Sequence, residues 1–135
     1  MTDDPDALED QLYDFVYLYD AAFDRAAQQT GLSAAQACLL VQLRRGSRTM
    51  SDLAVELVCD ASNVSHLVAR LEARELVARE PDPADRRARQ VSITAAGRRT
   101  CRSLEKRFTL PAERVGRLSE SEQRQLSCLL SKILT

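Results

Sequence analysis

Tryptophan is absent from this chain, and histidine, glycine and proline are scarce. The 135 residues include one histidine, four glycines and four prolines. One histidine leaves no Ser-His-Asp constellation, and scattered glycines form no phosphate-binding loop, so we expect neither an enzyme nor a cofactor. No apolar run approaches the roughly 18 residues of a membrane span, and the acidic N-terminus is unlike a secretory leader. We therefore expect one small cytoplasmic domain without a membrane partner.

Cysteine is also sparse, and its spacing excludes a metal centre. The four cysteines form no Cys-x-x-Cys pair, so no zinc ligand set is expected. Cys38, Cys101 and Cys128 lie on apolar stripes, which predicts core packing as reduced thiols. Cys59 differs because it precedes a predicted helix, whose N-terminus would lower its pKa. A redox-sensing role for Cys59 is the less favoured alternative.

The charges are segregated along the chain although the net charge is only −1. Residues 1–30 hold eight acids and one arginine, whereas residues 61–109 hold eleven bases and six acids. A basic block separated along the chain from an acidic one is typical of a polarised DNA-binding protein. A solvated surface with helix-surface pairing is the alternative.

Part of the basic block is an arginine-rich loop over residues 82–89. Arg86, Arg87 and Arg89 follow two prolines, and a short alternating strand comes next, with Val91 and Ile93 on one face. A hairpin of this kind projects cations from a rigid base and suits a narrow DNA minor groove.

Two short helices are predicted upstream of this loop. Residues 49–52 form a capping-box variant that opens the first, and the second runs from Ala61 to about Arg74. The second helix has an apolar stripe formed by Val64, Leu67, Val68 and Leu71. Its opposite face is small and polar, with Ser62, Asn63, Ser65, His66, Ala69 and Arg70. Such a pair is a helix-turn-helix, and residues 76–79 then predict a strand that pairs with residues 90–94.

The predicted fold class is therefore mainly α, a winged helix-turn-helix with a two-stranded β wing. The ordered motifs resemble the multiple antibiotic resistance regulator (MarR) family over residues 8–134, most densely over 49–99. They are Leu53-Ala54, Ser62-Asn63-Val64-Ser65, Leu71-Glu72, Leu76-Val77, Asp85-Arg86-Arg87 and Ile93-Thr94-Ala95-Ala96-Gly97-Arg98, with Ser33-Ala34-Ala35-Gln36 upstream. The resemblance implies a homodimeric transcription regulator, usually a repressor, that binds a pseudo-palindromic operator in double-stranded DNA. Many members respond to small phenolic or aromatic effectors or to thiol oxidation.

Two positions depart from the family pattern. Val58 stands in the helix-turn-helix turn, and Glu75 follows the second helix, where the family usually has glycine. Glycine supplies a positive φ at such turns, which costs other residues strain. Either the helices continue differently here or the turns are strained.

The flanking segments predict dimerisation helices around a single domain of residues 1–135. In residues 8–30, apolar side chains recur at helical spacing until Gly31 ends the helix. Residues 35–43 are apolar nearly all round, which predicts a buried helix. Residues 100–134 continue the stripes, with an interruption at Pro111 and a capping box at 119–122. By resemblance, residues 8–30 and 100–134 interlock across a two-fold axis and residues 33–99 form the winged helix; the alternative is closure of the monomer's own core.

Several side chains are expected to contact DNA or an effector. Major-groove contacts are expected from Ser62, Asn63, Ser65, His66 and Arg70, because Asn pairs with adenine and Arg with guanine. Arg86, Arg87 and Arg89 are expected in the minor groove, with Asp85 restricting their rotamers. Tyr13, Tyr17 and Phe23 are candidates for an effector pocket, although ordinary dimer packing is the favoured interpretation. The rival function is a winged-helix module for protein–protein contact without DNA binding.

Overall fold

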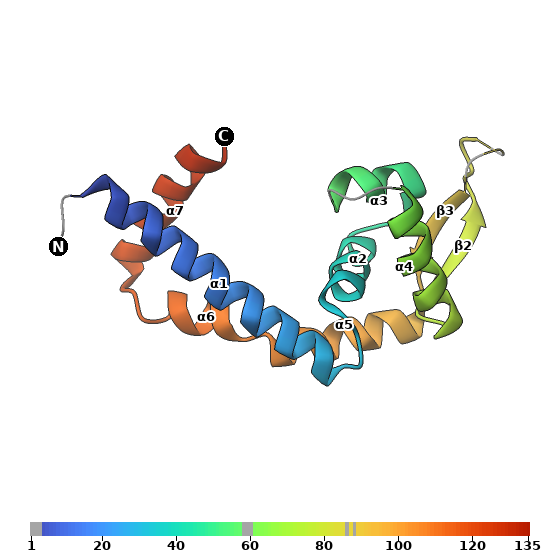
Figure 1. The fold of residues 1–135 in the computed structure, drawn as a ribbon, viewed down its shortest axis with the longest axis horizontal. Helices are drawn as coiled ribbons and strands as arrows, with labels where there is room; N and C mark the ends of the chain where they lie inside the picture. Colours follow the sequence, from blue (N-terminus) through green and yellow to red (C-terminus); the bar gives the residue numbers. More distant parts are fainter. Residues whose placement is uncertain (1–3, 58–60, 86, 88) are drawn as a thin grey trace. The chain divides into compact units, whose positions relative to one another are not determined.

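The computed structural model describes residues 4–57, 61–85, 87 and 89–135 (Figure 1). The helices and strands follow in the order α1 Pro5–Gln29, α2 Ala34–Arg44, β1 Arg48–Thr49, α3 Met50–Glu56, α4 Ala61–Ala73, β2 Val77–Pro81, β3 Arg89–Ile93, α5 Ala95–Arg107, α6 Leu110–Val115 and α7 Glu120–Leu134. They group into two compact units. The terminal unit contains α1 up to Ala22 and Phe108–Thr135, and the central unit is Phe23–Arg107. The predicted mainly helical class is confirmed.

The central unit contains all the fully buried side chains among the described residues. Its core is leucine-rich and draws on α2, α3, α4, α5 and the sheet, with Leu39, Leu40, Leu43, Leu53, Val64, Val68, Leu71, Val91, Cys101 and Leu104 at most 2% exposed. Helix α2 begins with a capping box, because Ser33 and Gln36 bond each other's backbone N–H. The expectation that this helix is buried all round was too strong, since Ala35 and Cys38 are exposed. Core packing was likewise wrong for Cys38 and is confirmed for Cys101.

The predicted helix-turn-helix is present in the described residues on both sides of its turn. Helix α3 begins with the Thr49–Asp52 capping box, and α4 covers the predicted range to within one residue. The four residues of the predicted stripe on α4 are all buried. Val58 and Cys59 lie outside the described residues, so the consequence of the missing glycine at Val58 stays a prediction.

The wing belongs to a three-stranded antiparallel sheet in the order β1-β3-β2. The predicted hairpin is confirmed, with Val77 opposite Ile93 and Pro81 opposite Arg89. Strand β1 was not foreseen. It pairs Arg48 with Val91 and Thr49 with Gln90. Two residues are too short for an alternating pattern, so only the partner strand reveals them.

The backbone at the end of α4 shows how Glu75 takes the place of the usual glycine. Glu75 has φ 60°, and the Leu76 N–H donates to the Leu71 carbonyl at 3.0 Å while the Glu75 N–H donates to the Glu72 carbonyl at 2.9 Å. These bonds form a Schellman motif, whose C′ residue needs the left-handed conformation. Glu75 therefore adopts the backbone conformation that glycine favours. At this position the expectation of a strained turn is correct, and the helix does not continue differently.

The terminal unit is a set of helices without a buried side chain among its described residues. Helix α7 begins with the predicted Ser119–Glu122 capping box, and Pro111 lies in the first turn of α6, after the expected interruption. The rings of Tyr19 and Phe108 meet edge to face at 4.9 Å. Cys128 is exposed, so core packing was wrong for it within this chain.

Two kinds of feature are absent from the described residues. None of their helices has both the length and the low polarity needed to cross a membrane. Across the same residues, no group of three or more His, Cys, Asp or Glu side chains is placed to hold a metal ion.

Candidate nucleic-acid interface

The outer face of α4 presents the side chains that the sequence assigned to base contacts. Burial of the Val64–Leu71 stripe turns the opposite side of the helix to solvent, as 3.6-residue periodicity requires. Ser62, Asn63, His66 and Arg70 are exposed, and Ser65 is half-buried. Asn63, His66 and Arg70 line one surface hollow of about 270 Å³ together with Leu67. The structure therefore brings these three polar side chains together on one helical face.

The wing presents the second group of predicted residues, at the tip of the β2–β3 hairpin (Figure 1). Asp82 Oδ1 accepts a hydrogen bond from the Ala84 N–H at 2.9 Å, and Asp85 Oδ1 accepts one from the Arg87 N–H at 3.0 Å. Two successive aspartates thus shape the loop backbone by Asx turns. Arg87 and Arg89 are exposed, whereas Arg86 lies outside the described residues.

Asp85 bonds to the backbone of its own loop. Its carboxylate accepts from the backbone N–H of Arg87, and no ion pair joins it to Arg87 or Arg89, the two described arginines of this loop. The side chain therefore helps to fix the loop path, and because Arg86 lies outside the described residues, its restriction of the wing arginine rotamers stays a prediction. Both described wing cations remain available to an external anion.

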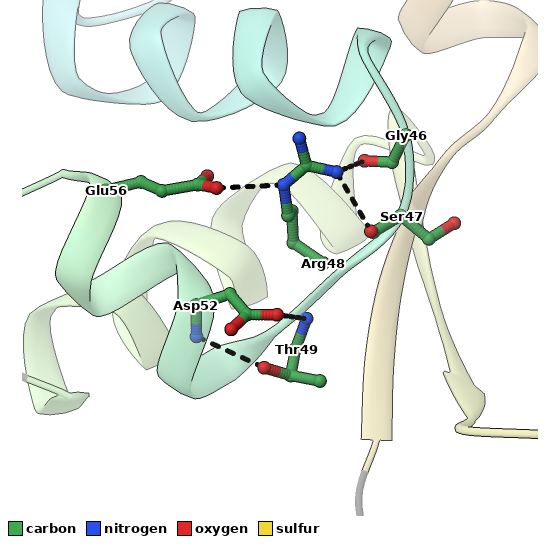
Figure 2. Close-up of polar contacts among 6 residues, drawn as sticks. All are labelled: Gly46, Ser47, Arg48, Thr49, Asp52 and Glu56. Atoms are coloured by element: carbon green, nitrogen blue, oxygen red, sulfur yellow. Dashed lines mark hydrogen bonds and ion pairs between the residues drawn. The ribbon is translucent and has the colours of Figure 1, made fainter. Parts of the chain in front are cut away.

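A polar cluster around Arg48 connects the sheet to the helix-turn-helix (Figure 2). Arg48 Nε donates to Glu56 Oε1 at 2.9 Å, and its Nη1 donates to the carbonyls of Gly46 at 3.1 Å and Ser47 at 3.2 Å. The side chains of Arg48 and Glu56 are 26% and 33% exposed. Sequence reasoning missed this cluster, although Arg48 stands directly before the capping box that it did identify.

A second ion pair joins the wing to α4, the second helix of the helix-turn-helix, which would be its recognition helix. Arg79 of β2 lies 3.6 Å from Glu72 of α4, measured from Nε to Oε2. That separation is too long for a hydrogen bond, and Arg79 Nε has no hydrogen-bond partner among the described residues. The tighter connection is therefore the one through Arg48.

The described thiols differ in environment. Burial raises the pKa of Cys101 above its ordinary value, and nearby Arg44 and Arg98 oppose that shift only in part. Cys101 Sγ also donates to the Leu40 carbonyl at 3.7 Å. Such a thiol is mainly protonated and a poor nucleophile. Cys59, the candidate for redox sensing, lies outside the described residues.

The candidate effector residues fall in different units. Tyr13 and Tyr17 are 66% and 75% exposed on the terminal unit, and Phe23 is half-buried in the central unit. Tyr13 lines a hollow of about 240 Å³ with Glu9, Leu12 and Val16. A larger hollow of about 320 Å³ lies in the central unit and was not predicted from the sequence. It is lined by Ala35, Cys38, Gln42, Glu56, Leu57, Asn63 and Leu67.

Comparisons with known proteins find similarity to one family. The sequence model described as "MarR family" matches residues 30–88. The chain is 35% identical over 80 residues to the HTH-type transcriptional repressor NicR of Pseudomonas putida, covering 58% of this chain and 51% of NicR. It is 36% identical over 78 residues to the transcriptional regulator HosA of Escherichia coli O111:H-, covering 57% of this chain and 58% of HosA. These matches thus span little more than half of each relative.

Solved structures resemble nearly the whole chain. AbsC, a MarR family transcriptional regulator from Streptomyces coelicolor, is 25% identical with a TM-score of 0.80, covering 99% of this chain and 94% of AbsC. The apo form of MarR from E. coli is 24% identical with a TM-score of 0.79, covering 95% of this chain and 97% of MarR. Together with the helix-turn-helix, the wing and the ordered motifs, these findings show that residues 30–88 match the MarR family and that the chain has the winged-helix fold of MarR structures.

Proposed function

We propose that this protein is a sequence-specific DNA-binding transcription regulator. The observation that carries the proposal is the pairing of an exposed polar face on α4 with a cationic wing in the same compact unit. A helix of this kind reads base edges in the major groove, while wing arginines enter the adjacent minor groove. The resemblance to NicR, which is named a repressor, supports repression as the mode of action.

The residue roles follow from side-chain chemistry. Asn63 pairs bidentately with adenine and Arg70 with guanine, while Ser62, Ser65 and His66 contact neighbouring bases or phosphates. Arg87 and Arg89, together with Arg86, supply cations to the minor groove. Asp85 holds the loop that carries them.

The protein acts as a homodimer through its terminal unit. The support is the number of large apolar side chains exposed on α1 and α7, with Leu8, Leu12, Phe15, Val16, Leu126, Leu129, Leu130, Ile133 and Leu134 between 38% and 81% exposed. So many large apolar side chains left exposed on two helices are typical of an interface. Two-fold symmetry of the dimer then requires a pseudo-palindromic operator.

A small aromatic or phenolic effector completes the proposal, with Tyr13, Tyr17 and Phe23 as its candidate contacts. Effector binding would release the operator by favouring a dimer whose recognition helices no longer match the half-site spacing. The support here is the exposure of the two tyrosines together with the family resemblance.

Selection from a random duplex library tests the function. We expect an enriched inverted repeat, with half-sites about one helical turn apart. Binding of that duplex and of a scrambled one, each at two salt concentrations, then separates specific from generic affinity. A protein that enriches no sequence and shows no salt-dependent binding would instead be a protein–protein interaction module.

A further inference from the structure

Two consecutive residues of β1 bond to the two ends of helix α3 (Figure 2). At the start of the helix, the Asp52 N–H donates to Thr49 Oγ1 at 3.1 Å and the Thr49 N–H donates to Asp52 Oδ2 at 3.3 Å. At its end, Glu56 accepts from Arg48 Nε at 2.9 Å. The seven-residue helix is thereby fixed to a two-residue strand at both ends.

The same strand belongs to the wing sheet. Arg48 pairs with Val91 and Thr49 with Gln90, both on β3, and β3 begins at Arg89 directly after the arginine loop. Helix α3 in turn packs against α4, the helix with the polar outer face. A continuous set of contacts therefore runs from the wing through β1 and α3 to α4.

Arg48 is the residue best suited to make that connection stiff. Its planar guanidinium uses two nitrogens on three acceptors, since Nη1 also bonds the Gly46 and Ser47 carbonyls of the segment entering β1. A lysine has the charge but lacks this fork. Half-burial of both ion-pair partners also restricts their motion and reduces solvent screening.

We propose that Arg48 and Glu56 are positioning residues that set the wing relative to the recognition helix. The pair touches no base in this role. It fixes the separation at which the wing arginines and the α4 side chains meet one DNA duplex. The inference rests on the proposed DNA-binding function. It adds that DNA binding depends on a fixed position of the wing relative to α4.

A double-mutant cycle with the wing tests this role. Affinity for the selected operator is measured by fluorescence anisotropy for wild type, Arg87→Ala, Arg48→Met and the double variant. Distant residues with purely local roles give additive effects, whereas coupled ones do not. We expect the fold-loss caused by Arg87→Ala to be about threefold or more smaller in the Arg48→Met background than in wild type. Equal fold-losses in the two backgrounds would overturn the proposal.

A matched control comes from another ion pair in the central unit. Arg44 of α2 pairs with Glu105 of α5, a pair that includes no residue of the sheet or of α3, and both side chains are about half exposed. Arg44→Met should be additive with Arg87→Ala. If it reproduces the coupling of Arg48→Met, general loosening explains the result and the positioning role is wrong.

A second variant and a DNA-free measurement separate this inference from the proposed function. Glu56→Ala removes the other partner, which is not part of the buried core, and should show the same coupling. Residual dipolar couplings report the relative orientation of α3 and the β2–β3 hairpin in the free protein. In wild type the couplings should fit a single relative orientation, whereas in Arg48→Met they should require two. A wild type that binds no duplex would reject the function, while a single fitted orientation in Arg48→Met would reject the positioning role whatever the protein binds.

Discussion

The hydroxyl of Thr94 bridges the end of the recognition helix and the start of α5. Thr94 Oγ1 donates to the Glu75 carbonyl at 2.7 Å and accepts from the Gly97 N–H at 3.0 Å. The Thr94 N–H also donates to the Leu76 carbonyl at 3.1 Å. A single residue thus caps one helix and holds the strained turn that leaves another, which makes this junction sensitive to small changes.

Replacement of Glu75 by glycine should stabilise the protein. A non-glycine residue at φ 60° is strained by about 1–2 kcal/mol, and the larger unfolded-state entropy of glycine offsets about half of that gain. We expect the free energy of unfolding to rise by roughly 0.5–1 kcal/mol in Glu75→Gly, measured by urea denaturation. Glu75→Ala is the control, because it keeps Cβ. An equal gain in that control would assign the effect to the glutamate side chain.

Gly97 should tolerate no side chain. A Cβ at this position would overlap the Leu76 carbonyl oxygen and approach Ile93 Cγ1 to 2.7 Å. That carbonyl is held by the Thr94 N–H, so it cannot move aside without losing a hydrogen bond. Gly97→Ala should lower the free energy of unfolding by about 3 kcal/mol, the upper end of overpacking costs. Gly116 has φ −62°, and a Cβ there would lie 3.1 Å from its nearest neighbour, the Ala112 carbonyl oxygen. Gly116→Ala should therefore change the free energy of unfolding by far less in the same assay.

These junctions show where sequence reasoning succeeds and where it stops. Capping boxes at Thr49 and Ser119 and the apolar stripe of α4 were predictable because each depends on residues within a few positions. Strand β1 and the Arg48–Glu56 pair were not, because a two-residue strand exists only through its partner β3. Exposure of Cys38 was missed for a related reason, since residues 35–43 are apolar on both faces and periodicity cannot tell which one packs.

The wing and the recognition helix should fail in different ways when mutated. Arg87→Ala removes a cation, so affinity should fall for operator and scrambled duplex alike and the salt slope should flatten by roughly one unit. Asn63→Ala and Arg70→Ala remove base contacts worth about 1–3 kcal/mol each where pairing is bidentate, so operator preference should fall while generic affinity persists. Titrations of both duplexes at two salt concentrations measure this. Arg102→Ala removes an exposed cation on α5 and is the control. If both α4 variants still discriminate fully between operator and scrambled duplex, the bases are read by a different surface.

The described cysteines should react with thiol reagents in a fixed order. Cys38 and Cys128 are exposed, whereas burial raises the pKa of Cys101 and so lowers its thiolate fraction at a given pH. Alkylation near pH 8 followed by peptide mass spectrometry should label Cys101 last. Its labelling should accelerate on unfolding in urea. Equal rates for the three thiols in the folded protein would contradict the buried position of Cys101.

The terminal helices should determine whether the protein associates. Leu130 and Ile133 are 40% and 65% exposed on α7, and no side chain in the described part of the terminal unit is buried. If a second copy covers this surface, sedimentation at micromolar concentration should give twice the 15.1 kDa chain mass. Leu130→Asp should shift that mass toward the monomer and weaken operator binding, because a buried unpaired carboxylate is costly and each monomer reads one half-site. Gln125→Asp adds the same charge on the same helix at an exposed polar position and should leave the dimer intact. A wild type that sediments as 15.1 kDa would show that α1 and α7 serve another partner.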